Sequence, residues 1–495
     1  MYNAIQLAKK PGKSVDTTVC LVFKNPSIHA DDAALDDALN NELTAATKRT
    51  ECSGGNGNIT FVYANDQRVA LLGLGEADDL DAQTLRVAGY QLVKALCRVG
   101  AKAAHVSVNA AVSDQISNET FGQALTEGVV LGSFKFDEFK SADPDDKSPQ
   151  KLAVSFSDTS ATAGAQVGQA LGEAANYART LATTPPNIAT TTWIASQAES
   201  LAKSNKLKCS VIKGAALKSN KLQGLINVGK ASENPPCLIQ LTYTPAGKSR
   251  NVPTVLLVGK TITYDTGGLS LKISNGMKGM KYDKCGGMAV LGAMHAIAKI
   301  KPACQVIALL PTAENSVAGN AYRPDDVIEY LNGVTVEVTN TDAEGRIVLA
   351  DALAYGCKKH KPDAVIDLAT LTGGVVVALG RACAGFWCED DDLTDRLQVG
   401  ADASGERIWR LPLYDDYIQM MKSKHADIWN SAPVREAHPI QGAAFLSHFV
   451  EEGVPWAHID IAGPADYDKN VPPIDAGPSG FGVRLILETL RNWSS

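Results

Sequence analysis

The distribution of apolar and polar positions predicts strands and helices that alternate along the chain. Residues 82–98 carry the apolar period of an amphipathic helix. Short apolar and β-branched runs on both sides of this helix are predicted strands, at 18–23, 59–63, 69–74 and 152–156. The alternation predicts a smaller N-terminal α/β domain over residues 1–160.

A proline-free segment follows at 161–182 and is rich in Ala, Gln, Glu and Leu. This composition favours a connecting helix. The sequence Thr183-Thr184-Pro185-Pro186-Asn187 should end the helix, because consecutive prolines cannot continue it. We therefore expect a linker helix and turn at 161–187, followed by a larger C-terminal domain at 188–495.

The C-terminal part repeats the alternation of strands and helices. Helical patterns occur at 287–300 and 346–359. Short apolar runs are predicted strands, at 254–258, 305–310, 334–338, 364–368 and 457–461. The pattern predicts an α/β domain with a largely buried, central mixed sheet. Ligands of such sheets bind where strands end and loops begin.

Composition narrows the class of protein without identifying it. The chain has 495 residues, more than one ordinary core holds, and a net charge of −7 that does not favour a nucleic-acid partner. No signal peptide or membrane span is predicted, and the ten cysteines are scattered without a C-x-x-C pair. We therefore expect a cytoplasmic protein with free thiols. Cys285 is expected to be a buried packing residue rather than a nucleophile.

Ionisable residues concentrate after two of the predicted strands. Lys260, Asp265 and Lys272 follow one strand, Asp283 lies further on, and N-T-D-A-E-G-R at 340–346 follows another. Each residue alone could be a turn or cap residue, and acidic residues commonly begin helices. Together they place polar chemistry at strand ends, among glycines that permit close approach of the backbone.

The run at 340–346 resembles the signature of the leucyl aminopeptidase family of cytosolic two-metal exopeptidases. Further blocks of that family match V-G-K at 258–260, Y-D-T-G-G at 264–268, M-K-Y-D at 280–283, A-T-L-T-G at 369–373, W-x-L-P-L at 409–413, A-D-I-W-N at 426–430 and W-A-H-I-D-I-A-G at 456–463. The resemblance is strong over residues 170–495 and weaker through the N-terminal domain. It implies a metal-dependent hydrolase of peptides.

The resemblance implies five metal ligands. Asp265 and Glu344 would bridge two divalent cations. Lys260 and Asp283 would complete the tighter site, and Asp342 would complete the more exchangeable one. Four carboxylates balance two dications if Lys260 binds as an uncharged amine. Oxygen and nitrogen ligands suit Zn²⁺ or Mn²⁺, and also Co²⁺ or Mg²⁺.

The resemblance also implies the chemistry of the site. A water bridging the metals would become the hydroxide nucleophile, and one metal would bind the free α-amine of the peptide. Lys272 and Arg346 would be catalytic residues that bind no metal, with Lys272 stabilising the oxyanion. A bicarbonate, held by Arg346 and by the backbone of Gly345 and Leu371, would be the general base.

Four further residues match positions around the substrate. Met280, Thr370 and Gly373 would shape an adaptable apolar pocket for leucine and other apolar N-terminal residues. Met280 could instead be core packing. Asn340 would lie near the nucleophile or only hold its loop. The implied partners are peptides with a free N-terminus, and the implied assembly is a homohexamer of two trimers.

Two departures and two alternatives accompany this interpretation. The run Thr183-Thr184-Pro185-Pro186-Asn187 differs from the N-x-P-x-N pattern that is common in the family. Thr261 stands where the family usually has glycine, so its side chain must be accommodated beside Lys260. The sequence Gly259-Lys260-Thr261 also resembles the end of a phosphate-binding loop, but Thr254 replaces the first glycine of that motif. A non-catalytic DNA-binding or structural role is the other alternative. The complete set of ligands and catalytic residues argues against it.

Overall fold

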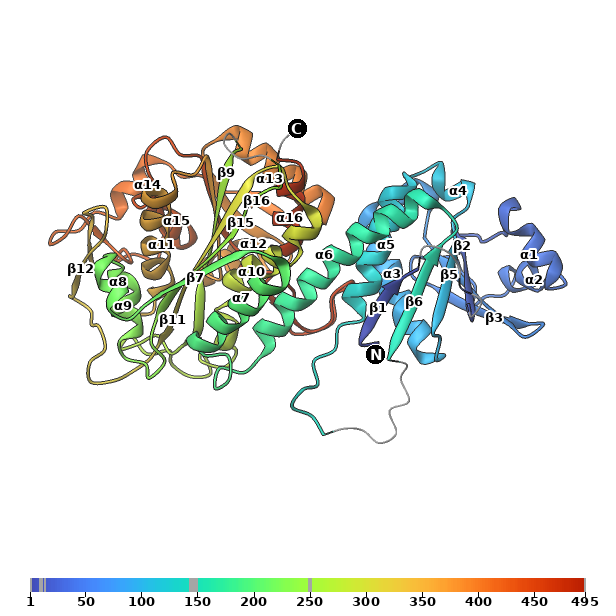
Figure 1. The fold of residues 1–495 in the computed structure, drawn as a ribbon, viewed down its shortest axis with the longest axis horizontal. Coiled ribbons are helices and arrows are strands. Elements are labelled where there is room, and N and C mark those ends of the chain that lie inside the picture. Colours follow the sequence, from blue (N-terminus) through green and yellow to red (C-terminus); the bar gives the residue numbers. More distant parts are fainter. Residues whose placement is uncertain (1, 9–11, 13–14, 142–149, 248–251, 494–495) are drawn as a thin grey trace. The chain divides into compact units, whose positions relative to one another are not determined.

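The computed structural model describes residues 2–8, 12, 15–141, 150–247 and 252–493. The chain divides into two compact units. The first consists of Met1–Asn176 with Lys469–Ala476, and the second of Tyr177–Asp468 with Gly477–Ser495. Each unit is an α/β structure with its own sheet (Figure 1).

The N-terminal unit is built around a six-stranded sheet in the order β1-β6-β5-β2-β4-β3. Neighbouring strands run parallel, except that β3 and β4 form an antiparallel pair at one edge. The strands are β1 (Ala4–Leu7), β2 (Thr17–Val22), β3 (Ile59–Ala64), β4 (Gln67–Gly73), β5 (Ala103–Ser107) and β6 (Lys151–Phe156). The helices are α1 (Ala33–Ala38), α2 (Glu42–Thr47), α3 (Ala82–Arg98), α4 (Ala110–Ser113) and α5 (Asn118–Gly132).

A short segment from the far end of the chain completes the N-terminal unit. Its Asp475 accepts a hydrogen bond from the Tyr90 hydroxyl at 2.6 Å and pairs with Lys94 at 2.9 Å. Both partners lie on α3. The chain therefore passes between the units three times, after Asn176, Asp468 and Ala476.

The C-terminal unit contains a nine-stranded mixed sheet in the order β16-β15-β18-β14-β9-β11-β8-β7, with β10 paired to β11 off this path. Its strands are β7 (Lys208–Lys213), β8 (Cys237–Tyr243), β9 (Thr254–Gly259), β10 (Thr261–Asp265), β11 (Gln305–Asn315), β14 (Ala364–Ala369), β15 (Ala384–Cys388), β16 (Ile408–Arg410) and β18 (Trp456–Asp460). Strands β11, β9, β14 and β18 run parallel, whereas β15, β8 and β7 add antiparallel pairs.

Helices and two small sheets surround this central sheet. Helix α6 (Thr159–Thr183) begins in the N-terminal unit and ends in the C-terminal unit. The other helices of the C-terminal unit are α7 (Thr191–Asn205), α8 (Ala215–Ser219), α9 (Gln223–Gly229), η3 (Met280–Tyr282), α10 (Cys285–Ile300), α11 (Glu344–His360), α12 (Gly373–Leu379), α13 (Asp391–Ser404), α14 (Asp415–Met420), α15 (His438–Ser447) and α16 (Val483–Arg491). The small sheets contain β12 (Val327–Glu329), β13 (Thr335–Glu337) and β17 (Ile428–Trp429), and β19 (Asp466–Tyr467) with β20 (Gly477–Pro478).

The two-domain α/β prediction is confirmed, and each predicted strand occurs in the structure. One strand lies elsewhere than expected. The run 334–338 forms β13 in a separate three-stranded sheet, not in the central one. Helix α6 ends at Thr183, just before the double proline. Among the described residues, no helix combines the length and the apolarity that a membrane crossing needs.

Helices α10 and α11 pack against opposite faces of β9. A Cβ on Gly259 would stand 2.6 Å from the Gly287 Cα of α10, so glycine on both sides permits this close approach. A Cβ on Gly356 of α11 would meet Leu256 at 2.5 Å. Strand residues 256 and 259 point to opposite faces, since side chains alternate along a strand. The first turn of α10 thus lies beside the carboxyl end of β9, where Lys260 follows.

Candidate metal centre

The five predicted ligands converge at the ends of elements in the C-terminal unit. Lys260 directly follows β9, and Asp265 is the last residue of β10. Glu344 is the first residue of α11, and Asp342 lies in the loop before it. Asp283 lies between η3 and α10. Residues distant in sequence therefore meet at one edge of the sheet.

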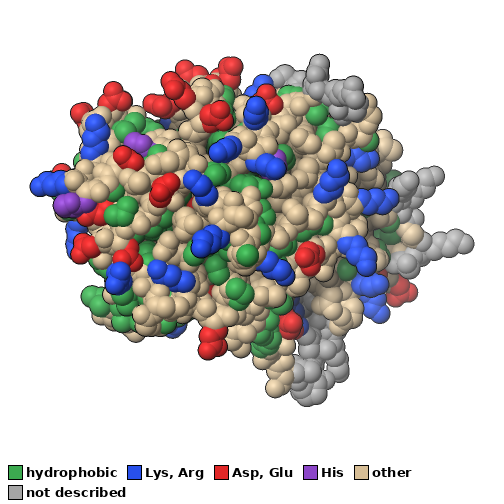
Figure 2. Space-filling view, turned by 60° about the vertical axis from the view of Figure 1, so that its left-hand side comes forward, with side chains coloured by type: hydrophobic (Ala, Val, Ile, Leu, Met, Phe, Trp, Pro, Cys, Tyr) green, Lys and Arg blue, Asp and Glu red, His purple; other side chains and the backbone are tan. Residues whose placement is uncertain are grey.

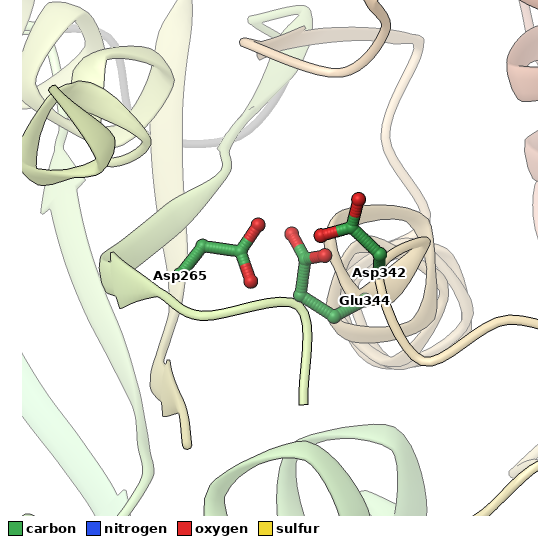
Figure 3. Close-up of side chains that lie close together, drawn as sticks. All are labelled: Asp265, Asp342 and Glu344. Carbon is green, nitrogen blue, oxygen red and sulfur yellow. The ribbon is translucent and has the colours of Figure 1, made fainter. Parts of the chain in front are cut away.

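Three carboxylates point toward one another at the centre of this site (Figure 3). One oxygen from each of Asp265, Asp342 and Glu344 lies within 4.8 Å of the others. Burial, and then the charge of Asp265, raises the pKa of Glu344 well above its usual value and also raises the pKa of Asp342. Carboxylates this close resist full ionisation unless cations neutralise them.

Lys260 is buried and joins two of the carboxylates. Its Nζ lies 2.7 Å from Asp283 Oδ1 and 3.0 Å from Glu344 Oε1, and it donates to the Thr370 carbonyl at 2.9 Å. Burial alone would lower the pKa of this amine, but the charges of Asp283 and Glu344 raise it above its usual value. Gly345 makes room for the lysine stem, because a Cβ there would stand 2.3 Å from Lys260 Cε.

Lys272 joins the other two carboxylates from the loop that follows β10. Its Nζ lies 2.8 Å from Asp265 Oδ2 and 2.6 Å from Asp342 Oδ1. Burial opposes the charge of this amine, but Asp265 raises its pKa above the usual value. Two lysines thus face four carboxylates, which leaves a formal charge of about −2 when all are ionised.

The donor set fits divalent cations. Asp283 Oδ2 and Glu344 Oε2 are buried and have no hydrogen-bond partner among the described residues. Buried carboxylate oxygens are costly without a partner, and a metal ion would satisfy them. Burial also raises the pKa of Asp283 to about 6, although Lys260 opposes the shift. Carboxylate oxygens and an amine nitrogen are suitable ligands for Zn²⁺, Mn²⁺, Co²⁺ and Mg²⁺.

The loop that carries Asp342 is fixed by two asparagines. Asn340 Oδ1 accepts a hydrogen bond from the Asp342 backbone N–H at 2.9 Å. Asn430 Oδ1 accepts the Thr339 and Asn340 N–H groups at 2.8 and 3.3 Å, and its Nδ2 donates to the Asn340 carbonyl at 2.6 Å. Asn340 therefore holds its loop and also lines the cavity described below.

Sequence reasoning missed two residues that orient the ligands. Asn315 ends β11 and donates to Asp265 Oδ1 at 2.8 Å and to the Thr341 carbonyl at 3.0 Å. The Tyr322 hydroxyl donates to the same carbonyl at 2.7 Å. The strand was predicted to stop at residue 310, five residues before its end in the structure. With the correct end, Asn315 would have been noticed as a polar residue at the end of a strand.

Arg346 lies buried in the first turn of α11, which begins two residues earlier than predicted. Its Nη1 donates to the Asn430 carbonyl at 3.0 Å, and its Nε is buried without a partner among the described residues. Burial lowers the pKa of Arg346 to about 10, so it is a cation at neutral pH. The Leu371 N–H, expected beside it, already donates to Asp460 Oδ1 at 3.0 Å.

A cavity of about 300 Å³ adjoins this cluster. It is lined by every predicted site residue except Gly345, whose backbone packs against Lys260. Lining residues not singled out by the sequence are Gly279, Tyr282, Ala343, Thr372, Ser431, His438, Ala462, Ala465 and Asp466. A wider hollow of about 800 Å³ in the N-terminal unit follows residues 15–18 and 63–68. The one described cluster of metal-binding type lies in the smaller cavity.

Thr261 is accommodated by a glycine on the neighbouring helix. A Cβ on Gly287 would overlap Thr261 Oγ1, so the missing side chain of α10 provides the space. Thr261 Oγ1 donates to the Gly259 carbonyl at 2.9 Å. The chain continues from Lys260 into strand β10 and not into a helix, which is incompatible with a phosphate-binding loop.

Cys285 is buried at the start of α10, and burial raises the pKa of its thiol to about 12. A thiol with this pKa is a poor nucleophile near neutrality. The ten cysteines are all free. Both observations agree with the prediction of a packing role and unpaired thiols.

Comparison with known proteins identifies the family. Residues 176–487 match the catalytic domain of the cytosol aminopeptidase family, and residues 19–143 match its N-terminal domain. A probable cytosol aminopeptidase of Aquifex aeolicus is 39% identical over 442 residues, covering 88% of this chain and 86% of the relative. That of Solibacter usitatus is 41% identical over 429 residues, covering 86% and 87%.

Solved structures with the same fold include two enzymes. The bottromycin maturation enzyme BotP in complex with Mn has a TM-score of 0.85 and 33% identity, covering 97% of this chain and 100% of that one. A variant of tomato leucine aminopeptidase has a TM-score of 0.85 and 30% identity, covering 99% and 97%. The chain therefore belongs to the cytosol aminopeptidase family of peptidase hydrolases.

Proposed function

We propose that the protein releases N-terminal residues, leucine and other apolar residues among them, from peptides with the help of two divalent cations. One observation carries the proposal. Four acidic side chains and two lysines, all predicted as functional, form a single, largely buried network beside a cavity of about 300 Å³. Family membership supports the aminopeptidase activity, and the Mn in the BotP structure supports a metal requirement.

The five ligands that we propose are Lys260, Asp265, Asp283, Asp342 and Glu344. Bound cations would supply Lewis acidity and would lower the pKa of a bound water. The chain contributes the neutralising charge, and the burial of Glu344 and Asp265 excludes competing solvent. Lys260 must lose a proton to bind a metal, so its raised pKa makes metal loading dependent on pH.

Lys272 is proposed to stabilise the negative charge that develops on the substrate carbonyl oxygen. Its ammonium contacts Asp265 and Asp342, and once cations neutralise these carboxylates it can donate to the substrate. Its side chain is 17% exposed, so it can face the cavity while its stem remains packed.

Arg346 is proposed to hold bicarbonate as the general base. Its Nε finds no hydrogen-bond partner in the part of the chain that the structure describes, and this and its place in the first turn of α11 favour an anion. Gly345 and Leu371 would contribute backbone groups. The Leu371 N–H would have to be shared with Asp460, so Arg346 is expected to contribute most of the binding energy.

A sharp test uses a leucine amide with a free amine and the same compound with its amine blocked. The chain loaded with Mn²⁺ or Zn²⁺ should hydrolyse the first and leave the second intact, because only a free N-terminus can be recognised. A chelator should abolish the activity, and Mn²⁺ or Zn²⁺ should restore it. Equal rates on the two compounds, measured by product release, would refute the proposal.

Replacement of Lys272 by methionine should lower kcat on the leucine substrate by about 10²–10³-fold, as expected for loss of one preorganised donor to an oxyanion. The methionine keeps the apolar stem, so KM and metal content should change little. Steady-state kinetics and metal analysis of the purified variant would decide. A large loss of bound metal would mean that Lys272 organises the ligands instead.

The alternative of DNA binding receives no support from the surface in Figure 2. On this face Lys and Arg side chains are interspersed with Asp, Glu and apolar groups, and they form no continuous basic stripe. The homohexamer and the cytoplasmic location stay predictions. A light-scattering mass of six times 52.3 kDa would support the assembly.

A further inference from the structure

Asp466 is the one acidic residue that lines the cavity outside the proposed ligand set, among the residues that the structure describes. It begins β19, where it pairs opposite Pro478 of β20. Its side chain is 26% exposed. Neither the proposed metal binding nor the proposed chemistry uses this carboxylate, although it shares the cavity with both.

The wall of the cavity that Asp466 lines combines apolar and small residues. Met280, Ala462 and Ala465 contribute aliphatic surface, and a Cβ on Gly373 would meet nothing within 4 Å. Such a wall leaves space for a long side chain. A long aliphatic stem would find apolar contacts there, and a polar head beyond it would need a partner.

Asp466 and residues of η3 line the same cavity. One of them is Tyr282, the last residue of η3. Met280, proposed for the substrate pocket, is the first residue of the same turn. The carboxylate and the proposed pocket therefore belong to the same cavity.

The Asp466 carboxylate is only loosely paired. Among the described residues, the nearest cation is Arg381, whose Nη1 lies 3.7 Å from Asp466 Oδ1, beyond the roughly 2.7–2.9 Å typical of charge-assisted hydrogen bonds. Arg381 also approaches the exposed Asp468 at 3.8 Å. Among the described residues, no hydrogen bond is donated to the Asp466 carboxylate, so its lone pairs are available to a ligand.

We propose that Asp466 recognises a cationic N-terminal side chain, so that the enzyme accepts lysine and arginine in addition to apolar residues. The aliphatic stem of either residue would lie along Met280 and Ala465, and the charged head would reach Asp466. This inference rests on the proposed aminopeptidase function and names a substrate class for the same cavity.

The test measures kcat/KM for lysyl, arginyl and leucyl aminomethylcoumarin substrates with the full chain loaded with Mn²⁺. In Asp466→Asn the ratio of the lysyl to the leucyl value should fall about tenfold, as expected for loss of one partly buried charge-assisted contact. Asp468→Asn is the matched control. It removes the other carboxylate near Arg381 outside the cavity, so the ratio should stay at the wild-type value.

A converse variant separates recognition from folding. Asp466→Lys should lower the lysyl rate further and raise the rate on a glutamyl substrate relative to leucyl. An unchanged ratio in both variants, or equal loss on every substrate, would overturn the inference. So would a wild-type enzyme that cleaves leucyl but not lysyl or arginyl substrates. Failure of the wild-type chain on every free-amine substrate would overturn the proposed function itself, and this inference with it.

Discussion

Replacement of Asp342 by asparagine should lower aminopeptidase activity by about 10³-fold or more, which corresponds to about 4 kcal/mol of transition-state stabilisation. Asp342 lies within 4.8 Å of Asp265 and Glu344, and asparagine keeps its shape while removing one charge from the cluster. The variant should still fold. In the absence of metal, burial and then the charge of Asp265 raise the pKa of Asp342, so a neutral side chain at this position removes an unfavourable charge.

Thermal unfolding with and without Mn²⁺ tests both parts of this prediction. The wild-type melting temperature should rise with metal, because a ligand that binds only the native state stabilises it. At a free metal concentration a hundredfold above Kd, the free energy of unfolding increases by about 2.7 kcal/mol. The increase should be smaller in Asp342→Asn. Asp37→Asn, at an exposed position of the N-terminal unit, is the control and should behave as wild type. Full activity in Asp342→Asn would refute the proposed site.

Replacement of Gly345 by alanine should cost activity about 10²-fold or more, although the change adds one methyl group. The new Cβ would stand 2.3 Å from Lys260 Cε and 2.6 Å from its Nζ, so the lysine must move. Displacement of a catalytic group by about 1 Å can cost a hundredfold in rate. The same displacement would lengthen the contacts of Lys260 with Asp283 and Glu344 and should weaken metal binding.

The control for this variant is Gly319→Ala, because a Cβ at Gly319 meets nothing within 4 Å. Activity titrated against added Mn²⁺ would separate the two effects. A higher metal requirement in Gly345→Ala, with activity partly recovered at saturation, would agree with a displaced Lys260. Wild-type activity at every metal concentration would show that Gly345 does not make the room that Lys260 needs.

Much of the fold could be predicted because its signals are local. β-Branched runs between turn residues identified strands such as β9 and β14 closely, and the helix at 82–98 was predicted with its exact bounds. The short strand β1 was missed, since its four residues carry too little pattern. The start of α11 was placed two residues late because Gly345 has a low helix propensity, so the run of helix-forming residues begins only at Arg346.

The candidate site was predictable only in part. Lys260, Asp265 and Glu344 stand in motifs that identify them without a structure. Asn315 stands in no such motif, and Asn430 ends the matching block A-D-I-W-N without a role being implied for it, because the roles of both depend on partners 26 and 90 residues away in the sequence. Nothing local separates such an asparagine from one in an exposed turn. The space that Gly287 leaves for Thr261 could not be predicted for the same reason. Only the packing of a helix against a strand brings these two residues together.

The return of residues 469–476 to the N-terminal unit limits how this protein can be divided. A fragment that stops at Asn176 would lack Asp475 and would leave Tyr90 and Lys94 of α3 without that acceptor. A catalytic fragment that starts at Tyr177 would contain residues 469–476 but would lack the N-terminal unit against which they pack. The N-terminal unit is therefore formed by two separate segments of the sequence. To exchange it for a homologous unit, residues 469–476 would have to be replaced together with the N-terminal segment.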